Sequence, residues 1–160
     1  MNAALTPEQP PAQPQTGRHR EAARPEIART GHCQCRRIAY QVLGEPIDPH
    51  LCSCPHETRI SGAPAVLWVG FDKKGLTWTG PGGEPTWYTT WPTLRRGFCP
   101  TCGTHLVSVA DDSDMIMVTG FSLDDPSGTD PVGHSYRDEA VPWITITLAP
   151  DPLRPLPASQ

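Results

Sequence analysis

The stretch Phe98-Cys99-Pro100-Thr101-Cys102-Gly103 has the form of a zinc knuckle, a tight C-x-x-C turn that aims two sulphur atoms at one ion. Gly103 lets the backbone turn without a Cβ clash and brings N–H groups toward the sulphurs. A second pair, Cys33-Gln34-Cys35, lies far upstream, and alternate residues of an extended chain point to the same side. Four thiolates complete a tetrahedral site, so we expect one structural zinc ion on Cys33, Cys35, Cys99 and Cys102.

Two other interpretations of the C-x-x-C pair are a redox dithiol and a pair of buried, inert cysteines. A redox dithiol is typical of a reactive cysteine at the N-terminus of a helix in a βαβ unit. The sequence around Cys99 offers no such setting, because its apolar residues come in short β-branched runs. The spacing therefore favours structural zinc.

The remaining pair, Cys52-Ser53-Cys54, supplies only two thiolates, which cannot close a tetrahedral site. Glu57 and His56 follow within three residues, and either is a candidate third ligand. The fourth position is then open to water or substrate, as in catalytic zinc sites. A pair without metal is the alternative on spacing alone.

The pattern of apolar residues predicts strands rather than helices. Short β-branched or aromatic runs are bounded by Gly, Pro and Asp, and only a short helical turn is expected, around residues 58–61. We therefore expect an all-β fold of small stacked sheets with irregular loops, held together by zinc. The expected strands are 38–43, 65–71, 76–79, 86–90, 105–109, 115–121 and 143–148.

The chain of 160 residues suffices for one domain, expected at residues 30–148. Residues 1–29 combine Pro and Arg with few large apolar side chains, which predicts a disordered tail, and residues 149–160 predict a Pro-rich C-terminal tail. No secretory signal or membrane-spanning stretch is recognisable, so we expect a cytoplasmic protein. Six cysteines in that compartment favour metal ligands or reactive thiols over disulfides, and the net charge of −4 disfavours a nucleic-acid partner.

The order and spacing of these motifs resemble the glutathione-dependent formaldehyde-activating enzymes, whose domain also occurs in centromere protein V. The resemblance runs through residues 31–35, 38–40, 52–54, 61–64, 96–104 and 120–126. It implies a β fold, a structural zinc on the first four cysteines, and a second zinc at Cys52 and Cys54. The family pattern there is C-x-C-x-x-C, and Glu57 occupies the third cysteine's place in this chain. Glu57 is therefore preferred over His56 as third ligand.

The resemblance implies a carbon-sulphur lyase similar to S-hydroxymethylglutathione synthase. Such an enzyme adds a small thiol such as glutathione to formaldehyde or a related aldehyde, or catalyses the reverse. Cys52, Cys54 and Glu57 are then the catalytic zinc site, and Arg59 is a candidate contact for a carboxylate of the thiol.

Three further side chains are also candidates. Trp68 and Phe71 are expected either to wall the pocket or to belong to the core, and His134 is either a proton carrier or an exposed loop residue. The alternative function is a non-catalytic zinc-binding interaction module with a degenerate second site, which the cysteine-to-Glu57 departure favours. A thiol redox protein that pairs Cys52 with Cys54 is a third class.

Overall fold

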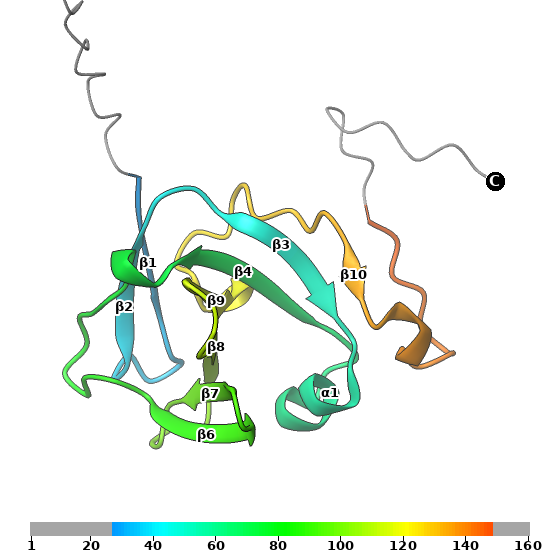
Figure 1. The fold of residues 1–160 in the computed structure, drawn as a ribbon, viewed down its shortest axis with the longest axis horizontal. Helices are drawn as coiled ribbons and strands as arrows, with labels where there is room; N and C mark the ends of the chain where they lie inside the picture. The colour runs from blue at the N-terminus through cyan, green and yellow to red at the C-terminus, as the bar shows by residue number, and fades with distance from the viewer. Residues whose placement is uncertain (1–26, 149–160) are drawn as a thin grey trace, which may run out of the picture.

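The computed structural model describes residues 27–148, so the expected C-terminal tail at 149–160 and most of the expected tail at 1–29 lie outside the described residues. Ala28 and Arg29, at the end of the expected N-terminal tail, instead begin the first strand. Within that range the fold is β-rich, with ten strands, one α-helix and three short 3₁₀ helices (Figure 1). The strands are β1 (Ala28–His32), β2 (Ala39–Leu43), β3 (Ile47–Cys52), β4 (Val66–Asp72), β5 (Thr77–Trp78), β6 (Thr86–Trp91), β7 (Leu94–Phe98), β8 (His105–Ala110), β9 (Met115–Thr119) and β10 (His134–Ser135). The helices are α1 (Pro55–Ser61) and the 3₁₀ helices η1 (Lys73–Gly75), η2 (Gly120–Ser122) and η3 (Arg137–Glu139).

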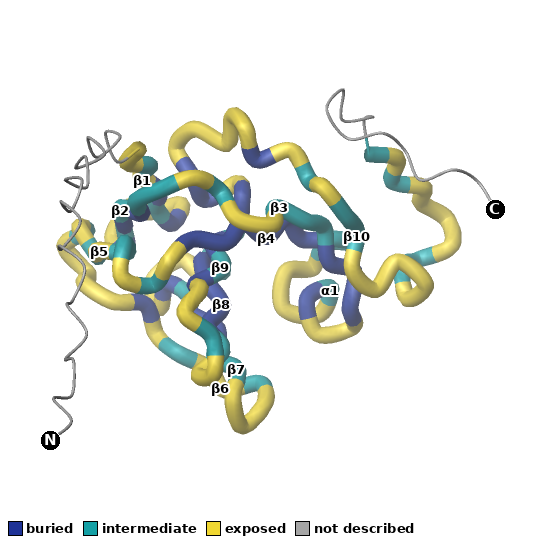
Figure 2. The backbone as a smooth tube through the Cα atoms, turned by 45° about the horizontal axis from the view of Figure 1, so that its top comes forward, coloured by how far each residue is buried: buried dark blue, intermediate teal, exposed yellow. Residues whose placement is uncertain are grey.

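The strands form two sheets. The smaller one has the order β1-β2-β5, and the larger one has the order β10-β3-β4-β9-β8-β7-β6. Neighbouring strands are antiparallel except for the short parallel pair of β10 and β3. Figure 2 shows that burial concentrates along β4, β9 and β8, in the middle of the larger sheet. Within residues 27–148, no helix is both long and apolar enough to cross a membrane.

Strand β4 is buried on both of its faces, and the second cysteine pair packs against one of them. Successive side chains of a strand point to opposite sides. Val69 and Phe71 join the main core, in which the smaller sheet contributes Tyr40. Trp68 instead belongs to a second cluster on the opposite face, which contains Cys52, Cys54 and Val66. The larger sheet therefore separates the core from a second buried face.

Helix α1 covers part of that second face. Cys54 is its N-cap, with extended backbone at φ −64° and ψ 153°, and the Glu57 N–H donates to Cys54 Sγ over 3.5 Å. Pro55 occupies the first helical position, where the missing N–H costs nothing, and Gly62 ends the helix at φ 68°. The helix thus begins before the turn expected at residues 58–61, and its first turn brings Glu57 onto the sheet.

The expected strand at 143–148 is wrong, because the structure forms no strand there and Trp143 is 76% exposed. The other six expected strands are confirmed to within two residues at each end. Strands β1, β3, β7 and β10 were not expected from the sequence. Strand β3 is interrupted by a register shift between Ile47 and His50, and β7 is rich in arginine. The sequences of both strands therefore lack the regular alternation of apolar and polar residues that predicts a strand.

Candidate metal centre and active site

The four cysteines expected to share one zinc ion are gathered in the structure. Cys33 and Cys35 lie in the turn after β1, while Cys99 and Cys102 lie in the knuckle between β7 and β8. Their sulphur atoms all lie within 4.8 Å of one another. Cys35 Sγ is 3.5 Å from Cys33 Sγ and 3.7 Å from Cys99 Sγ. Sulphurs at about 2.3 Å from a tetrahedral zinc ion are roughly 3.8 Å apart, so these residues fit the ion.

Hydrogen-bond donors surround the four sulphurs. The Ile38 N–H donates to Cys33 Sγ over 3.3 Å, and the Thr104 hydroxyl lies 3.2 Å from Cys102 Sγ. The side chain and then the backbone N–H of Thr104 lower the pKa of Cys102 to about 5. Such donors stabilise thiolates, which are the form that binds metal. Gly103 has φ 76°, in the left-handed region that favours glycine, which agrees with the tight turn expected at the knuckle.

The four-cysteine site also connects the two sheets. Cys33 follows a strand of the smaller sheet, and Cys99 follows a strand of the larger one. Both cysteines are completely buried and belong to the main core. A zinc ion bound here therefore joins the two sheets across that core.

The second pair of cysteines lies on the other face of the larger sheet. Cys52 is the last residue of β3, Cys54 caps α1, and each is 7% exposed. Burial raises the pKa of Cys52 to about 11, although a backbone hydrogen bond from Cys54 acts in the opposite direction. A metal that binds this pair must therefore displace a firmly held proton.

Glu57, expected as the third ligand of this pair, contacts an arginine instead. Its Oε1 lies 2.5 Å from Arg96 Nη1, and both side chains are buried. Burial raises the pKa of Glu57, and the Arg96 guanidinium opposes that shift. Within residues 27–148, only the four cysteines of the first site form a metal-sized cluster, so Cys52, Cys54 and Glu57 do not. The donor types suit zinc, but the structure does not gather them.

Aromatic rings enclose Arg96. Its Cζ lies 5.9 Å from the Trp68 ring centroid and 6.0 Å from that of Trp91. His56, the alternative third ligand, packs on Trp91 with ring centroids 4.2 Å apart. Arg96 could not be identified from the sequence, because Arg95 and Arg96 are neighbours of the same residue type. Only strand pairing decides which of the two side chains is buried.

A third polar residue completes this cluster. His105, at the start of β8, meets the Trp68 ring edge-on, with centroids 5.2 Å apart. Burial, and then Arg96, lower the pKa of His105 to about 4. Of the five buried side-chain polar atoms without a hydrogen-bond partner in the described residues, four belong here: Glu57 Oε2, Arg96 Nε and both ring nitrogens of His105. Buried polar atoms are normally paired, so this cluster marks the second face as more than packing.

A cleft of about 810 Å³ opens beside the four-cysteine site, and Cys52, Cys54 and Glu57 are not among the residues that line it. One wall comes from the turns that carry the first four cysteines, including Gln34, Arg36 and Cys102. The lining also includes Ser61 of α1 and Val66, whose strand partner is Cys52. The cleft therefore extends from the turn that carries Cys102 to the strand partner of Cys52.

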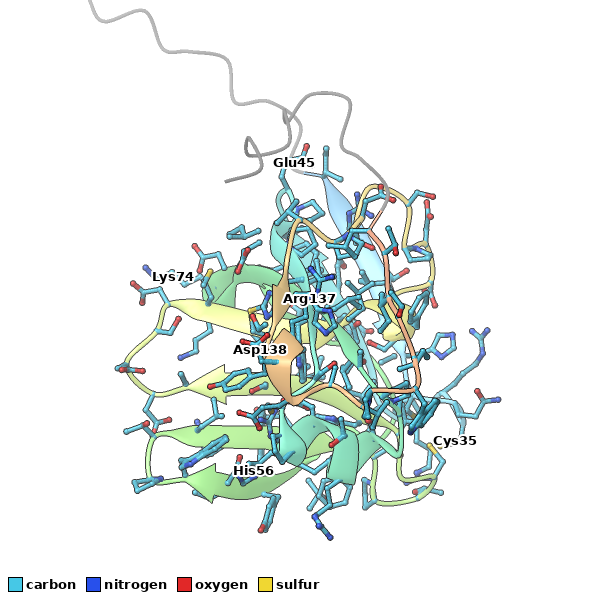
Figure 3. All side chains as sticks on the ribbon, turned by 90° about the vertical axis from the view of Figure 1, so that its right-hand side faces the viewer. Cys35, Glu45, His56, Lys74, Arg137 and Asp138 are labelled. Atoms are coloured by element: carbon cyan, nitrogen blue, oxygen red, sulfur yellow. The ribbon has the colours of Figure 1, made fainter. Side chains whose placement is uncertain are left out.

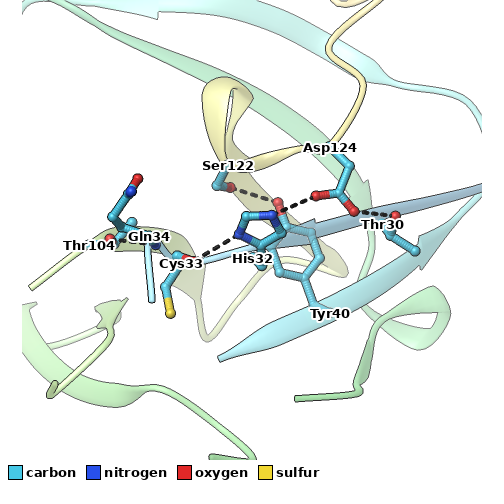
Figure 4. Close-up of polar contacts among 8 residues, drawn as sticks. All are labelled: Thr30, His32, Cys33, Gln34, Tyr40, Thr104, Ser122 and Asp124. Carbon is cyan, nitrogen blue, oxygen red and sulfur yellow. Dashed lines mark hydrogen bonds and ion pairs between the residues drawn. The ribbon is translucent and has the colours of Figure 1, made fainter. Parts of the chain in front are cut away.

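Hydrogen bonds fix the wall next to the first site (Figure 4). His32 Nε2 lies 3.0 Å from Asp124 Oδ1, and the Thr30 hydroxyl donates to Asp124 Oδ2 over 2.5 Å. The Gln34 backbone N–H donates to Thr104 Oγ1 over 3.1 Å, which ties the two cysteine turns together. This wall is therefore shaped before any ligand binds.

The other sequence candidates lie as follows. Arg59 is exposed in the last turn of α1 and is not among the residues that line the cleft. Phe71 is completely buried in the main core, and His134 Nε2 lies 2.8 Å from the hydroxyl of Ser53. In the side view of Figure 3, His56 and Cys35 both lie toward the lower end of the molecule, opposite Glu45.

Comparison with known proteins agrees with these motifs. The family model described as glutathione-dependent formaldehyde-activating enzyme matches residues 28–139. A crystal structure of a Rhodobacter sphaeroides protein shares the fold, with a TM-score of 0.53 and 19% sequence identity over 66% of this chain and 99% of that chain. Curated proteins gave no match. The family model matches well over half of the 160 residues of this chain. The chain therefore belongs to the glutathione-dependent formaldehyde-activating enzyme family.

Proposed function

We propose that this protein is a carbon-sulphur lyase that adds a small, glutathione-like thiol to formaldehyde or a related aldehyde, or releases the two again. Membership of the family indicates chemistry on thiols and aldehydes. The observation that carries the proposal is a cleft of about 810 Å³ lined by Leu51 and Val66, which are the chain neighbour and the strand partner of the buried Cys52. The cleft has the size of an ordinary small-molecule site.

The proposed reaction needs two reactants held together and one proton moved. The thiol sulphur forms a bond to the carbonyl carbon, the C=O π electrons go to the oxygen, and the thiol proton ends on that oxygen. The cleft walls hold the thiol next to the aldehyde, which replaces a chance encounter with a positioned one. The reverse reaction breaks the same carbon-sulphur bond and returns the proton to sulphur.

The proposal includes a second zinc ion, with Cys52 and Cys54 as ligands. A zinc ion bound at this site would stabilise the thiolate form of a coordinated thiol. Glu57 is the proposed third ligand, with His56 as the alternative. The unpartnered Oε2 of Glu57 supports its candidacy, while the ion pair of Oε1 with Arg96 opposes it.

The lyase is tested by following ¹³C-formaldehyde and glutathione by exchange NMR. Wild-type protein is expected to accelerate formation and breakdown of the hydroxymethyl adduct above the protein-free rate. Cys52→Ser and Cys54→Ser are expected to lose that acceleration while they keep the zinc of the first site. Wild-type protein that leaves the exchange rate at the protein-free value contradicts the proposal.

One observation favours a second candidate function, a non-catalytic zinc-binding interaction module. The carboxylate at the family's third cysteine position is held by Arg96, which leaves the second pair with two gathered ligands at most. The module predicts about one zinc ion per chain, and the lyase about two. Elemental analysis of the purified protein separates them. A redox role predicts a disulfide between Cys52 and Cys54, which thiol titration in the presence of a chelator detects.

A further inference from the structure

The cleft contains one permanent charge that has no partner in the described structure. Arg36 is the only lysine or arginine among the residues that line the cleft, and it makes no ion pair within residues 27–148. The one carboxylate in the lining is Asp124, which is already bonded to His32 and Thr30. An anionic group that enters the cleft therefore meets Arg36 as its available counter-charge.

The backbone holds Arg36 in an uncommon conformation. Its φ is 61°, in the left-handed region that favours glycine, and its N–H donates to the Cys33 carbonyl over 2.9 Å. Arg36 is one of three non-glycine residues with positive φ among the described residues, and the other two do not line the cleft. An arginine at a position where glycine is less strained points to a use for its side chain.

Gln34 stands beside Arg36 on the same wall. Its backbone N–H is bonded to Thr104, while its side-chain amide has no hydrogen-bond partner within residues 27–148. Figure 4 shows this amide extending away from the Cys33 sulphur. An amide N–H₂ and a guanidinium are both donors, and each can donate a hydrogen bond to a carboxylate oxygen.

The rest of the cleft suits the uncharged body of a small ligand. Leu51, Ile60, Val66 and Leu67 contribute apolar surface, and Phe121 stands at the rim with 83% of its surface exposed. A ligand that places a carboxylate at Arg36 can therefore extend along this apolar wall toward Val66, next to Cys52.

We propose that Arg36, assisted by Gln34, binds a carboxylate of the thiol substrate and makes the enzyme select anionic thiols over neutral ones. This inference rests on the proposed lyase function. It assigns the carboxylate contact to Arg36, in the turn that carries Cys33 and Cys35, instead of to Arg59, which does not line the cleft. The competing role for Arg36 is to balance the negative charge of the zinc-bound sulphurs.

The test compares two thiols of similar size, 3-mercaptopropionate and 2-mercaptoethanol, which differ by a carboxylate and a hydroxyl. Arg36→Gln is expected to raise KM for 3-mercaptopropionate roughly tenfold, with kcat little changed, because a charged hydrogen bond is lost. KM for 2-mercaptoethanol is expected to stay within about twofold. Arg36→Lys, which keeps the charge, is expected to recover part of the loss.

Arg37→Gln is the matched control, because Arg37 is the next residue, is exposed, and does not line the cleft. It is expected to change neither KM. Gln34→Ala leaves the charge beside the sulphurs untouched and is expected to raise KM for 3-mercaptopropionate about threefold. Equal effects of Arg36→Gln on both thiols overturn the proposal. Loss of zinc in Arg36→Gln together with an unchanged KM in Gln34→Ala also overturns the proposal. The role of Arg36 is then to balance the negative charge of the zinc-bound sulphurs.

Binding without turnover separates this inference from the lyase proposal. NMR titration of the zinc-loaded protein with S-methylglutathione, which cannot react at sulphur, is expected to show saturable binding that Arg36→Gln weakens roughly tenfold. If formaldehyde exchange is not accelerated but this binding persists, the lyase fails and the carboxylate site stands. If S-methylglutathione does not bind, or binds Arg36→Gln equally well, the carboxylate site fails whatever the exchange rate.

Discussion

Glu57 Oε1 and Arg96 Nη1 lie 2.5 Å apart on the second face of the larger sheet, and neither side chain is more than 5% exposed. The carboxylate comes from the first turn of α1 and the guanidinium from β7, so the pair fixes the helix to the sheet. Trp68 and Trp91 flank the guanidinium and exclude water from it. The residue that replaces the family's third cysteine is therefore part of a buried ion pair.

The first prediction follows from that burial. Glu57→Ala leaves the Arg96 charge buried without a partner, and removing one member of a buried pair typically costs about 3–5 kcal/mol. Urea unfolding of the zinc-loaded protein measures this loss of stability. The control is Asp111→Ala, which breaks the half-exposed pair with Arg95 and is expected to cost under about 1 kcal/mol. Equal losses in the two variants contradict the burial argument.

The second prediction concerns the metal at the second pair. Glu57→Cys restores the family's C-x-C-x-x-C pattern and is expected to raise the zinc occupancy of the second site, because three thiolates bind zinc more firmly than two thiolates and a carboxylate. Elemental analysis measures the change. Glu45→Cys adds a thiol at an exposed position at the other end of the molecule, and it is expected to add no zinc. Unchanged zinc in Glu57→Cys shows that position 57 does not contribute a ligand.

The four-cysteine site was predictable from sequence because its information is local. Two short spacings, C-x-C and C-x-x-C, each constrain a pair of sulphurs, and Gly103 marks the turn between the second pair and β8. Zinc chemistry then demands that the pairs meet, although the pairs stand 64 positions apart. Tertiary structure was needed only to bring them together.

The second face was not predictable in the same way, because it depends on long-range pairing. Arg96 is buried through the β7 register with Ser108 and through Glu57, and nothing nearby in sequence distinguishes it from Arg95. The strand expected at 143–148 fails for the complementary reason. Alternation of apolar and polar residues is a local property, whereas a strand also needs a neighbour, and Trp143 has 76% of its surface in solvent.

The third prediction uses the lowered pKa of His105. A histidine whose folded pKa, about 4, lies below its ordinary value of 6.5 binds its proton more readily in the unfolded chain. Stability is therefore complete above pH 6.5, is lost as the pH falls toward 4, and levels off below that. Between pH 7.5 and pH 5 the loss amounts to about 2 kcal/mol.

His105→Phe isolates this contribution, since phenylalanine keeps a ring against Trp68 but carries no proton. Urea unfolding of both proteins at pH 7.5 and pH 5 is expected to show a smaller pH effect in the variant, by about 2 kcal/mol. Acid also weakens zinc binding, but that effect is common to both proteins and cancels in the comparison. Parallel losses in the two proteins would show that His105 does not titrate as expected.

The last prediction concerns the ion that joins the two sheets. Cys99 is completely buried within the main core, and its sulphur lies 3.7 Å from that of Cys35. Cys99→Ser removes one of four thiolates, so the variant is expected to lose zinc and to unfold, because the binding energy of a structural zinc is also folding energy. Circular dichroism and zinc analysis measure both effects, and a chelator is expected to unfold the wild type in the same way. Cys54→Ser removes a buried thiol outside the four-cysteine site and is expected to keep the first zinc and the fold. A Cys99→Ser protein that loses its zinc and stays folded would mean that the two sheets hold together through the apolar core alone.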